Sequence, residues 1–478
     1  MNSFQSYKAL RYVLGMYMLA ACSDTSSPSN MGTDMTVFDD GVPDASVEQI
    51  DESIVSPDLG IEVDSYLTGD PCRPIVPAAA TLKPGLQTDG SRLSVNGRVI
   101  GPLGTEQPLE GFPSNVLPHP TAPVVYVTST SHDDRLLVVL DKTTLEPLQT
   151  LNPEDVYAGL ALDSRHQKLY VSGGESSLIF IYAVDDDGLL TLDGTLTAAG
   201  HVNYLFLDPM TDSIWFSQWD DAVVQRINIA SDLIDRRIEL PSPGWQFAVT
   251  DRRLWISMLA HPQLHIINLD ESDVPEPIST LGAVSDLCVL NNYMYAVISD
   301  SDGISRLDLD DPTNVTFISL GDELLDENEQ PYANSNANSI ICDPVENRLY
   351  VSRGSDNLIS VFNALNGDEL GLIPTGEYPT KLAHDSSTNT LWLSEGKGGT
   401  APSEGRTGKR VISGFARTLN LNEVDLEQAT ATAKNNFIHP KTVFPFECDG
   451  FFPVPTRPDQ RTPIEHIILI VKENKTFD

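Results

Sequence analysis

The sequence predicts an all-β protein whose main part is a seven-bladed β-propeller. The first observation is a unit that recurs seven times within the 478 residues. The second is the make-up of that unit, in which four short alternating strands are joined by turns rich in Asp, Asn, Gly and Pro. A repeat of this kind, about 40 to 50 residues long, is typical of a propeller blade. An aliphatic run near the end of the chain predicts, in addition, the first strand of an α/β domain whose remainder lies outside this sequence.

Each unit carries an aromatic anchor residue in the middle of an apolar strand. The anchors are Tyr126, Tyr170, Trp215, Trp255, Tyr295, Tyr350 and Trp392, at intervals of 44, 45, 40, 40, 55 and 42 residues. A single blade exposes both faces of its sheet, so it becomes stable only between neighbours in a ring. We therefore expect the anchors to be core residues rather than ligand contacts.

Two segments depart from the regular repeat. Residues 96–113 precede the first complete unit, and we expect them to supply the outer strand of the closing blade. The interval of 55 residues carries an acidic, polar insert at 321–336, which predicts a protruding loop. Such a loop is either a tolerated surface excursion or a place where a partner binds.

The strand motifs, among them VVYVTST, KLYVSGG and RLYVSRG, resemble those of the YVTN family of bacterial β-propellers. The turn of that family is present in a degraded form, as in LDPMTD and CDPVEN. The paired Gly-His and Trp-Asp of WD repeats are missing from the sequence. Trp219-Asp220 stands alone and is interpreted as a blade-surface pair.

The amino-terminal segment predicts export and a lipid anchor. Lys8 and Arg11 precede the apolar run Tyr12–Ala21, which is about half as long as a membrane-spanning helix requires. The run ends in LAAC, which resembles the bacterial lipoprotein signal. The resemblance implies that residues 1–21 are removed, that Cys22 is lipidated, and that the protein resides on a membrane of the cell envelope, on its periplasmic or outer surface. An ordinary secretory signal is the alternative.

Composition narrows the possible partners. A net charge of −38 repels nucleic acid, and a mean hydropathy of −0.15 excludes a polytopic membrane protein. Residues 22–75 are rich in Ser, Asp, Glu and Pro and predict a disordered acidic tether. The propeller is expected over 76–435 and a proline-rich linker over 436–463.

Four cysteines remain beside Cys22. Cys288 and Cys342 occupy corresponding places before two successive anchors, whereas Cys72 and Cys448 flank the ring. The favoured pairing joins 288 with 342 and 72 with 448, and reduced buried thiols are the alternative.

The sequence contains no complete catalytic or metal-binding motif before its last fifteen residues. The Asp-rich turns at 185–188 and 300–303 lack the full ligand series of a calcium loop, so they predict hairpin turns.

Residues 464–478 differ from the propeller units and predict the start of another domain. Ile467–Val471 is the aliphatic run typical of a strand buried in a parallel sheet, the alternative being a strand that pairs with the propeller. The segment IEHIILIVKENKTFD resembles the opening of the bacterial phosphoesterase family that includes phospholipase C and acid phosphatase, within the alkaline-phosphatase-like superfamily. The resemblance implies a divalent metal ion and assigns Glu473 and Asn474 to the metal or the phosphate. Lys475 replaces the family's more frequent Arg, and the family's nucleophile is not in this sequence.

These observations favour an exported, lipid-anchored propeller that forms the binding or scaffold half of a metal-dependent phosphoesterase. The chain alone is expected neither to hydrolyse phosphate esters nor to hold a cofactor tightly. The alternative is a non-enzymatic propeller that binds a protein or a cell-surface polymer. A quinone-dependent dehydrogenase is a weaker third hypothesis, because its cofactor-docking features are not apparent.

Overall fold

The computed structural model describes residues 85–86, 92–94, 99–131, 135–208, 210–258, 261–269, 274–320, 335–398, 413–437, 464 and 466. The elements reported below belong to one compact unit that includes Leu82–Lys441. Among these residues, no helix combines the length and the apolar character that a membrane crossing requires.

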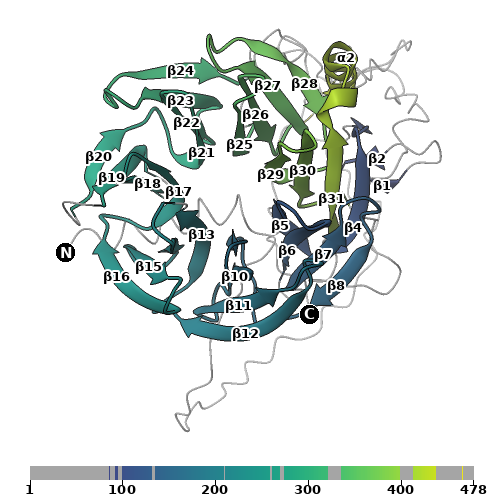
Figure 1. Cartoon of the computed structure of the whole chain (residues 1–478). Helices are drawn as coiled ribbons and strands as arrows, with labels where there is room; N and C mark the ends of the chain where they lie inside the picture. The colour runs from purple at the N-terminus through teal and green to yellow at the C-terminus, as the bar shows by residue number, and fades with distance from the viewer. Residues whose placement is uncertain are drawn as a thin grey trace, which may run out of the picture. The chain divides into compact units, whose positions relative to one another are not determined.

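Seven four-stranded antiparallel sheets are arranged around a central axis as the blades of a propeller (Figure 1). Blades 1 to 3 contain β5 (Phe112–Pro118), β6 (Val124–Thr130), β7 (Leu136–Asp141), β8 (Pro147–Leu151), β9 (Leu160–Asp163), β10 (Lys168–Ser172), β11 (Leu178–Val184), β12 (Leu190–Thr197), β13 (Val202–Asp208), β14 (Ser213–Gln218), β15 (Val223–Asn228) and β16 (Leu233–Glu239). Blades 4 to 6 contain β17 (Gly244–Thr250), β18 (Arg253–Met258), β19 (Gln263–Asn268), β20 (Glu276–Ser279), β21 (Val284–Leu290), β22 (Tyr293–Ile298), β23 (Gly303–Asp308), β24 (Val315–Ser319), β25 (Ala337–Asp343), β26 (Arg348–Arg353), β27 (Leu358–Asn363) and β28 (Glu369–Pro374).

Blade 7 is assembled from two distant parts of the chain. It contains β29 (Pro379–Asp385), β30 (Thr390–Glu395), β31 (Ser413–Asn420) and β4 (Thr105–Glu110), which pairs antiparallel with β31. The expectation that the leader supplies the outer strand of the closing blade is therefore confirmed. A small sheet of β1 (Gly85–Leu86), β2 (Arg92–Leu93) and β3 (Val99–Ile100) precedes this strand.

The core lies between the blades, as the repeat predicts. All seven anchors lie on the second strand of a blade, and none is more than 2 % exposed. Seven apolar clusters each span two neighbouring blades, and one of them joins blade 7 to blade 1. Because each blade buries both faces against its neighbours, closure of the ring leaves no blade face open.

In six of the seven blades, the residue two positions after the anchor carries a hydroxyl group. The first strand of most blades has a β-bulge, and the backbone N–H at or beside the bulge needs an acceptor. Ser257 Oγ accepts from Gln246 N at 2.9 Å, and Ser352 Oγ accepts from Ser339 N at 3.0 Å. These hydrogen bonds stabilise the first strands at their bulges.

A disulfide joins Cys288 on β21 to Cys342 on β25, with 5.8 Å between the Cα atoms. This is the pairing that the sequence favoured, and it links the innermost strands of blades 5 and 6. The Asp-rich segments at 185–188 and 300–303 lie in hairpin turns, as predicted. Asp185 Oδ1, for example, accepts the backbone N–H of Leu189 at 2.7 Å.

Helical structure follows the last propeller strand. A short 3-10 turn, η4 (Leu421–Glu423), leads into α2 (Leu426–Phe437), which packs on β28. Leu372 N donates to Thr430 Oγ1 at 2.8 Å, so the helix covers part of the outer edge of blade 6 (Figure 1). The sequence analysis did not predict this helix.

Candidate binding site in the central channel

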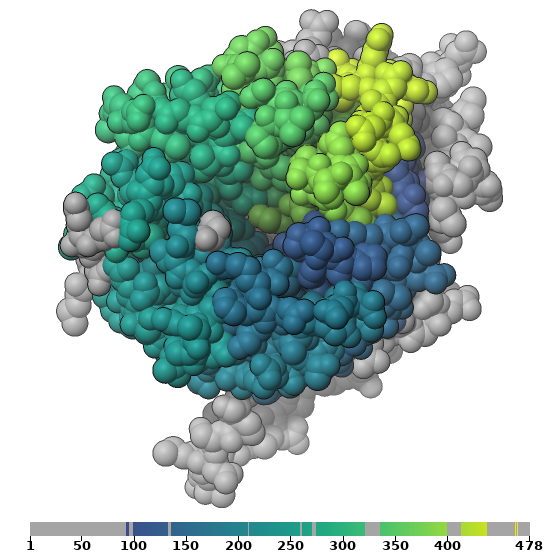
Figure 2. All heavy atoms as spheres, viewed as in Figure 1, coloured from purple at the N-terminus to yellow at the C-terminus, as the bar shows by residue number. Residues whose placement is uncertain are grey.

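The inner strands bring polar side chains together around the channel. We name as the channel group Asn115 on β5, Tyr204 on β13, Gln246 on β17, Asp286 on β21 and Lys381 on β29. Each of them lies at the bulge of its strand, so they occupy equivalent places in five blades. In the space-filling view the face turned to the reader is hollowed at the centre of the ring (Figure 2).

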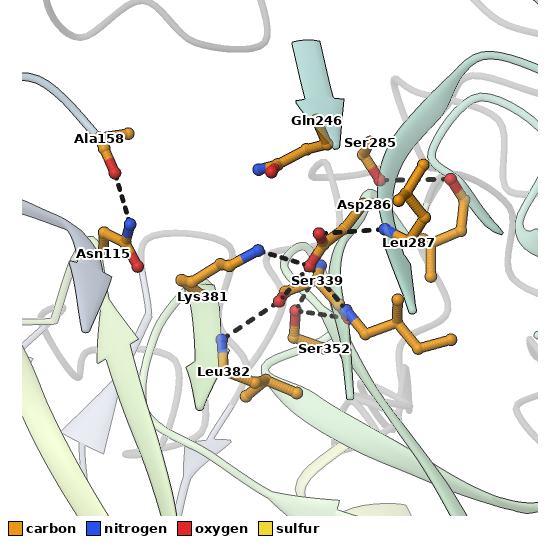
Figure 3. A network of polar contacts seen from close by, with 12 residues as sticks. Asn115, Ala158, Gln246, Ser285, Asp286, Leu287, Ser339, Ser352, Lys381 and Leu382 are labelled. Carbon is orange, nitrogen blue, oxygen red and sulfur yellow. Dashed lines mark hydrogen bonds and ion pairs between the residues drawn. The ribbon is translucent and has the colours of Figure 1, made fainter. Parts of the chain in front are cut away.

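An ion pair between two blades lies at the centre of this group. Lys381 extends from β29 toward Asp286, and its Nζ lies 2.7 Å from Asp286 Oδ2 (Figure 3). The same oxygen accepts Ser339 Oγ at 2.6 Å and Ile340 N at 3.0 Å. Because burial of a carboxylate that is 4 % exposed requires hydrogen bonds or a counter-charge, these three contacts compensate for the burial of Asp286.

Lys381 is less enclosed than its partner. Its side chain is 19 % exposed, against 5 % for Asp286. Among the described residues Asp286 is the hydrogen-bond acceptor of its ammonium group, which has three N–H donors. Its other two N–H donors have no acceptor among the described residues.

Two amide side chains extend the polar lining. Asn115 Nδ2 donates to Ala158 O in blade 2, and its Oδ1 accepts Val116 N at 2.8 Å (Figure 3). The Gln246 side chain extends from β17 toward the same space as Lys381 (Figure 3). Burial, reinforced by the nearby Tyr157 and the Asp286 carboxylate, raises the pKa of Tyr204 far above its usual range, so the phenol stays protonated and can donate.

Aromatic side chains continue the site at the ends of the strands. We name as the aromatic cluster Tyr157, His201, Trp219 and Trp245, which lie near the starts of the first strands and the ends of the second strands in blades 2 to 4. Ring centroids are 4.7 Å apart for Tyr157 and His201, and 5.6 Å apart for the two tryptophans. Trp245 also lies 4.9 Å from Tyr204, so the cluster is continuous with the channel group.

The imidazole of the aromatic cluster is uncharged near neutral pH. Burial lowers the pKa of His201 below its ordinary value, against the opposing pull of the Asp220 and Glu175 carboxylates. Asp220 Oδ1 accepts the backbone N–H of His201 at 2.9 Å. Trp219, interpreted from the sequence as one half of a surface pair, is therefore half-buried in a group of aromatic rings.

Several buried polar atoms around the aromatic cluster have no hydrogen-bond partner in the described part of the chain. They are His201 Nε2, Gln218 Nε2 and both side-chain polar atoms of Asn203. Asn203 and Gln218 are fully buried. Buried polar groups in folded proteins are nearly always paired, so these atoms mark a place where water or a ligand completes the structure.

Most of the site residues predicted from the sequence lie outside the described part of the chain. Cys22, Cys72, Cys448, Glu473 and Asn474 lie outside the described residues, as do Ile467–Val471 and most of the acidic insert. In the described ranges, no cluster of His, Cys, Asp or Glu has the arrangement of a metal site.

Sequence reasoning did not find the channel group, although a signal exists. Asn115, Tyr204 and Lys381 precede their anchors by eleven residues, and Gln246 and Asp286 precede theirs by nine. The blades with the shorter interval have shorter turns between the first two strands. A polar residue nine or eleven positions before an aromatic anchor marks the channel.

Comparisons with known proteins bear on the fold. No family model matches the sequence, and no curated protein matches it. The crystal structure of RRP9 WD40 repeats has a TM-score of 0.52 at 14% identity, covering 67% of this chain and 100% of that chain. The structure of U3-55K also has a TM-score of 0.52 at 14% identity, with 66% and 100% coverage.

A third solved structure, Kuenenia stuttgartiensis hydrazine synthase, has a TM-score of 0.49 at 11% identity, covering 60% of this chain and 93% of that chain. At such identities the similarity to these structures concerns the fold alone. The chain is a seven-bladed β-propeller. It shares this architecture with WD40 proteins, although the paired Gly-His and Trp-Asp signature is missing from its sequence.

Proposed function

We propose that this chain is the binding or scaffold part of an exported, lipid-anchored, metal-dependent phosphoesterase. The observation that carries the binding role is the channel group together with the aromatic cluster. These residues offer aromatic surface, a lysine with free donors and unpartnered buried polar atoms at one end of a rigid ring. A propeller scaffold fits such a role.

Two sequence features support the finer parts of the proposal. The LAAC string at 19–22 supports lipidation of Cys22, and EHIILIVKENKTFD supports fusion to a phosphoesterase domain. Glu473 and Asn474 would supply hard oxygen ligands, which suit a divalent metal ion that polarises a phosphoryl oxygen. The propeller contributes no catalytic group of its own in this proposal.

The lipid anchor can be tested by mass spectrometry of the protein purified from its source membranes. We expect a mature amino terminus at Cys22 that carries acyl chains, and a Cys22→Ala variant that is recovered without them. An unmodified Cys22 in the membrane fraction would contradict the anchor.

A non-enzymatic propeller that binds a protein or a cell-surface polymer is the second candidate. The aromatic cluster favours it, because aromatic side chains beside a polar rim are typical of binding surfaces whether or not an enzyme is attached. The reading frame after codon 478 separates the two candidates. A phosphoesterase continuation supports the first, and its absence supports the second.

A further inference from the structure

A second cavity lies at the other ends of the strands, across blade 7. It has a volume of about 750 Å³ and lies between the turn that joins β5 to β6 and the first two turns of α2. The start of β4 and the end of β31 form its floor. This volume is within the range of small-molecule sites, which is about 300 to 1,000 Å³. We name it the seam groove, because it lies where blade 7 meets blade 1.

A contact that recurs between other blades is missing at this seam. The hydroxyls of three tyrosine anchors, Tyr126, Tyr170 and Tyr295, donate to the turn between the third and fourth strands of the next blade. Tyr126 donates to Gly188 O at 2.9 Å, and Tyr295 donates to Ala364 O at 2.6 Å. Such contacts satisfy the polar tip of a buried aromatic residue.

Trp392 is the anchor at the seam, and the corresponding turn of blade 1 contains Lys142 and Thr143. Among the described residues its indole N–H has no hydrogen-bond partner, although the side chain is only 2 % exposed. Trp392, Lys142 and Thr143 all line the seam groove. The groove therefore occupies the place where the seams after blades 1, 2 and 5 have a direct contact.

Lys142 forms an ion pair within the seam instead of a contact with Trp392. Its ammonium donates to Asp385 Oδ2 at 2.8 Å and to His119 O. Burial alone would raise the pKa of Asp385, but hydrogen bonds from Lys142 and Ser387, with the charge of the lysine, hold it below its ordinary value. The pair is thus a neutral unit that joins blade 1 to blade 7.

The charges that line the groove disfavour an anionic ligand. Beside the Lys142–Asp385 pair, the charged residues of the groove are Glu423 and Asp425, both acidic. Eight lining residues carry hydroxyl groups, among them Thr390 and Thr418, and Asn420 and Gln428 add amides. Hydroxyls and amides both donate and accept hydrogen bonds. Apolar surface from Pro120, Pro123, Leu419 and Val424 lies between them.

We propose that the seam groove binds a short neutral oligosaccharide. Sugar hydroxyls match a lining that both donates and accepts, the C–H faces of the rings match the apolar strips, and the absence of charge avoids repulsion by Glu423 and Asp425. The site is separate from the channel group and does not depend on a phosphoesterase.

The test is isothermal titration of the mature chain with four neutral probes, namely the hexaoses of the malto, cello, xylo and chito series. Maltose and maltose 1-phosphate serve as a matched neutral and anionic pair. We expect at least one neutral probe to bind and the phosphate to bind more weakly than maltose. Binding of none of the neutral probes, or stronger binding of the phosphate, overturns the proposal.

Matched variants locate the binding. Thr418→Val keeps the shape of the side chain and removes one hydroxyl, and a lost hydrogen bond corresponds to a roughly two- to tenfold weaker affinity. Gln428→Ala, on the exposed side of α2, is expected to weaken binding similarly. It supplies a second test that does not depend on the folding of Thr418→Val. Thr316→Val, an exposed threonine on β24, is the control and should bind like the parent.

The indole resonances supply an independent readout. In spectra of protein labelled with 15N-tryptophan, the Trp392 signal, assigned by its loss in Trp392→Phe, should shift when the sugar binds. Trp215→Phe identifies the control signal, since Trp215 Nε1 is also unpartnered but lies in blade 3 under Arg226 and Arg236. A shift of Trp215 without a shift of Trp392, or affinities unchanged by Thr418→Val and Gln428→Ala, would show that the sugar binds elsewhere.

Discussion

Replacing Arg417 by Met is expected to destabilise the ring by about 3 to 5 kcal/mol, because it leaves a buried carboxylate without its partner. Arg417 lies on β31, and its side chain is 2 % exposed. Its Nε lies 2.7 Å from Glu395 Oε1 and its Nη2 lies 3.1 Å from Oε2 of the same residue. Glu395 is fully buried. Arg417 also binds Glu106 on β4, the strand that closes blade 7.

We expect a loss of this size because the Glu395 carboxylate would stay buried without a counter-charge. The lost attraction between Arg417 and Glu395 is the smaller contribution. In the double variant Arg417→Met/Glu395→Met both charges are removed, so the loss should be clearly smaller than in Arg417→Met alone. Urea unfolding followed by tryptophan fluorescence measures both variants against the parent. Arg226→Met is the control, since Arg226 pairs with Asp235 at a partly exposed site on blade 3 and should cost about 1 kcal/mol or less. A loss below about 1 kcal/mol in Arg417→Met, or an equal loss in the double variant, would refute the reasoning.

Three further predictions concern the same fold. Replacing Cys288 and Cys342 by Ala should cost up to about 4 kcal/mol in urea unfolding, because the bridge closes a loop with a sequence separation of 54, and a reductant should destabilise the variant less than it destabilises the parent. Ser257→Ala should cost about 1 to 3 kcal/mol, because it leaves the N–H of Gln246 without its acceptor, whereas Ser301→Ala in an exposed turn should cost little. Burial raises the pKa of Glu106, but hydrogen bonds and charges from Arg92 and Arg417 outweigh burial and lower the pKa below 4.5. Ionised Glu106 therefore stabilises the ring above pH 4.5, and this contribution is lost on further acidification. Glu106→Gln should flatten the pH dependence of the thermal midpoint in that range, and an unchanged slope would contradict the assignment.

The fold was predictable because its main determinant is periodic in the sequence. Each blade must bury both faces, so an aromatic residue recurs at the same place in every unit, and the seven anchors can be counted directly. The closing strand followed from the same count, since the last unit lacks a fourth strand of its own and the leader 96–113 supplies it.

The helix α2 was not predicted, although its sequence contains a signal. Leu426, Ala429, Ala433 and Phe437 are spaced by three, four and four residues, and the two alanines are buried. Alanines carry little weight in a search for apolar periodicity. The helix is stabilised by its contact with β28, a feature that local sequence does not encode.

The channel group could not be derived from the sequence for a different reason. Asp286 and Lys381 are separated by 95 residues, and they meet only because the ring places blades 5 and 7 around one axis. Within its own repeat, neither Asp286 nor Lys381 belongs to a recognisable motif. The favoured partner of Cys288 was accessible from the sequence, in contrast, because adjacent blades place equivalent residues of their inner strands side by side.

The most direct measurement of the proposed function is phosphate release by the complete gene product purified from its source membranes. The substrate is p-nitrophenyl phosphate, assayed with added Mg²⁺, Ca²⁺ or Zn²⁺. The proposal predicts hydrolysis that depends on the metal and is lost in Glu473→Ala, with none from a chain of residues 22–478. Absence of hydrolysis with every metal, or full activity in Glu473→Ala, would contradict it and leave a propeller whose role is binding alone.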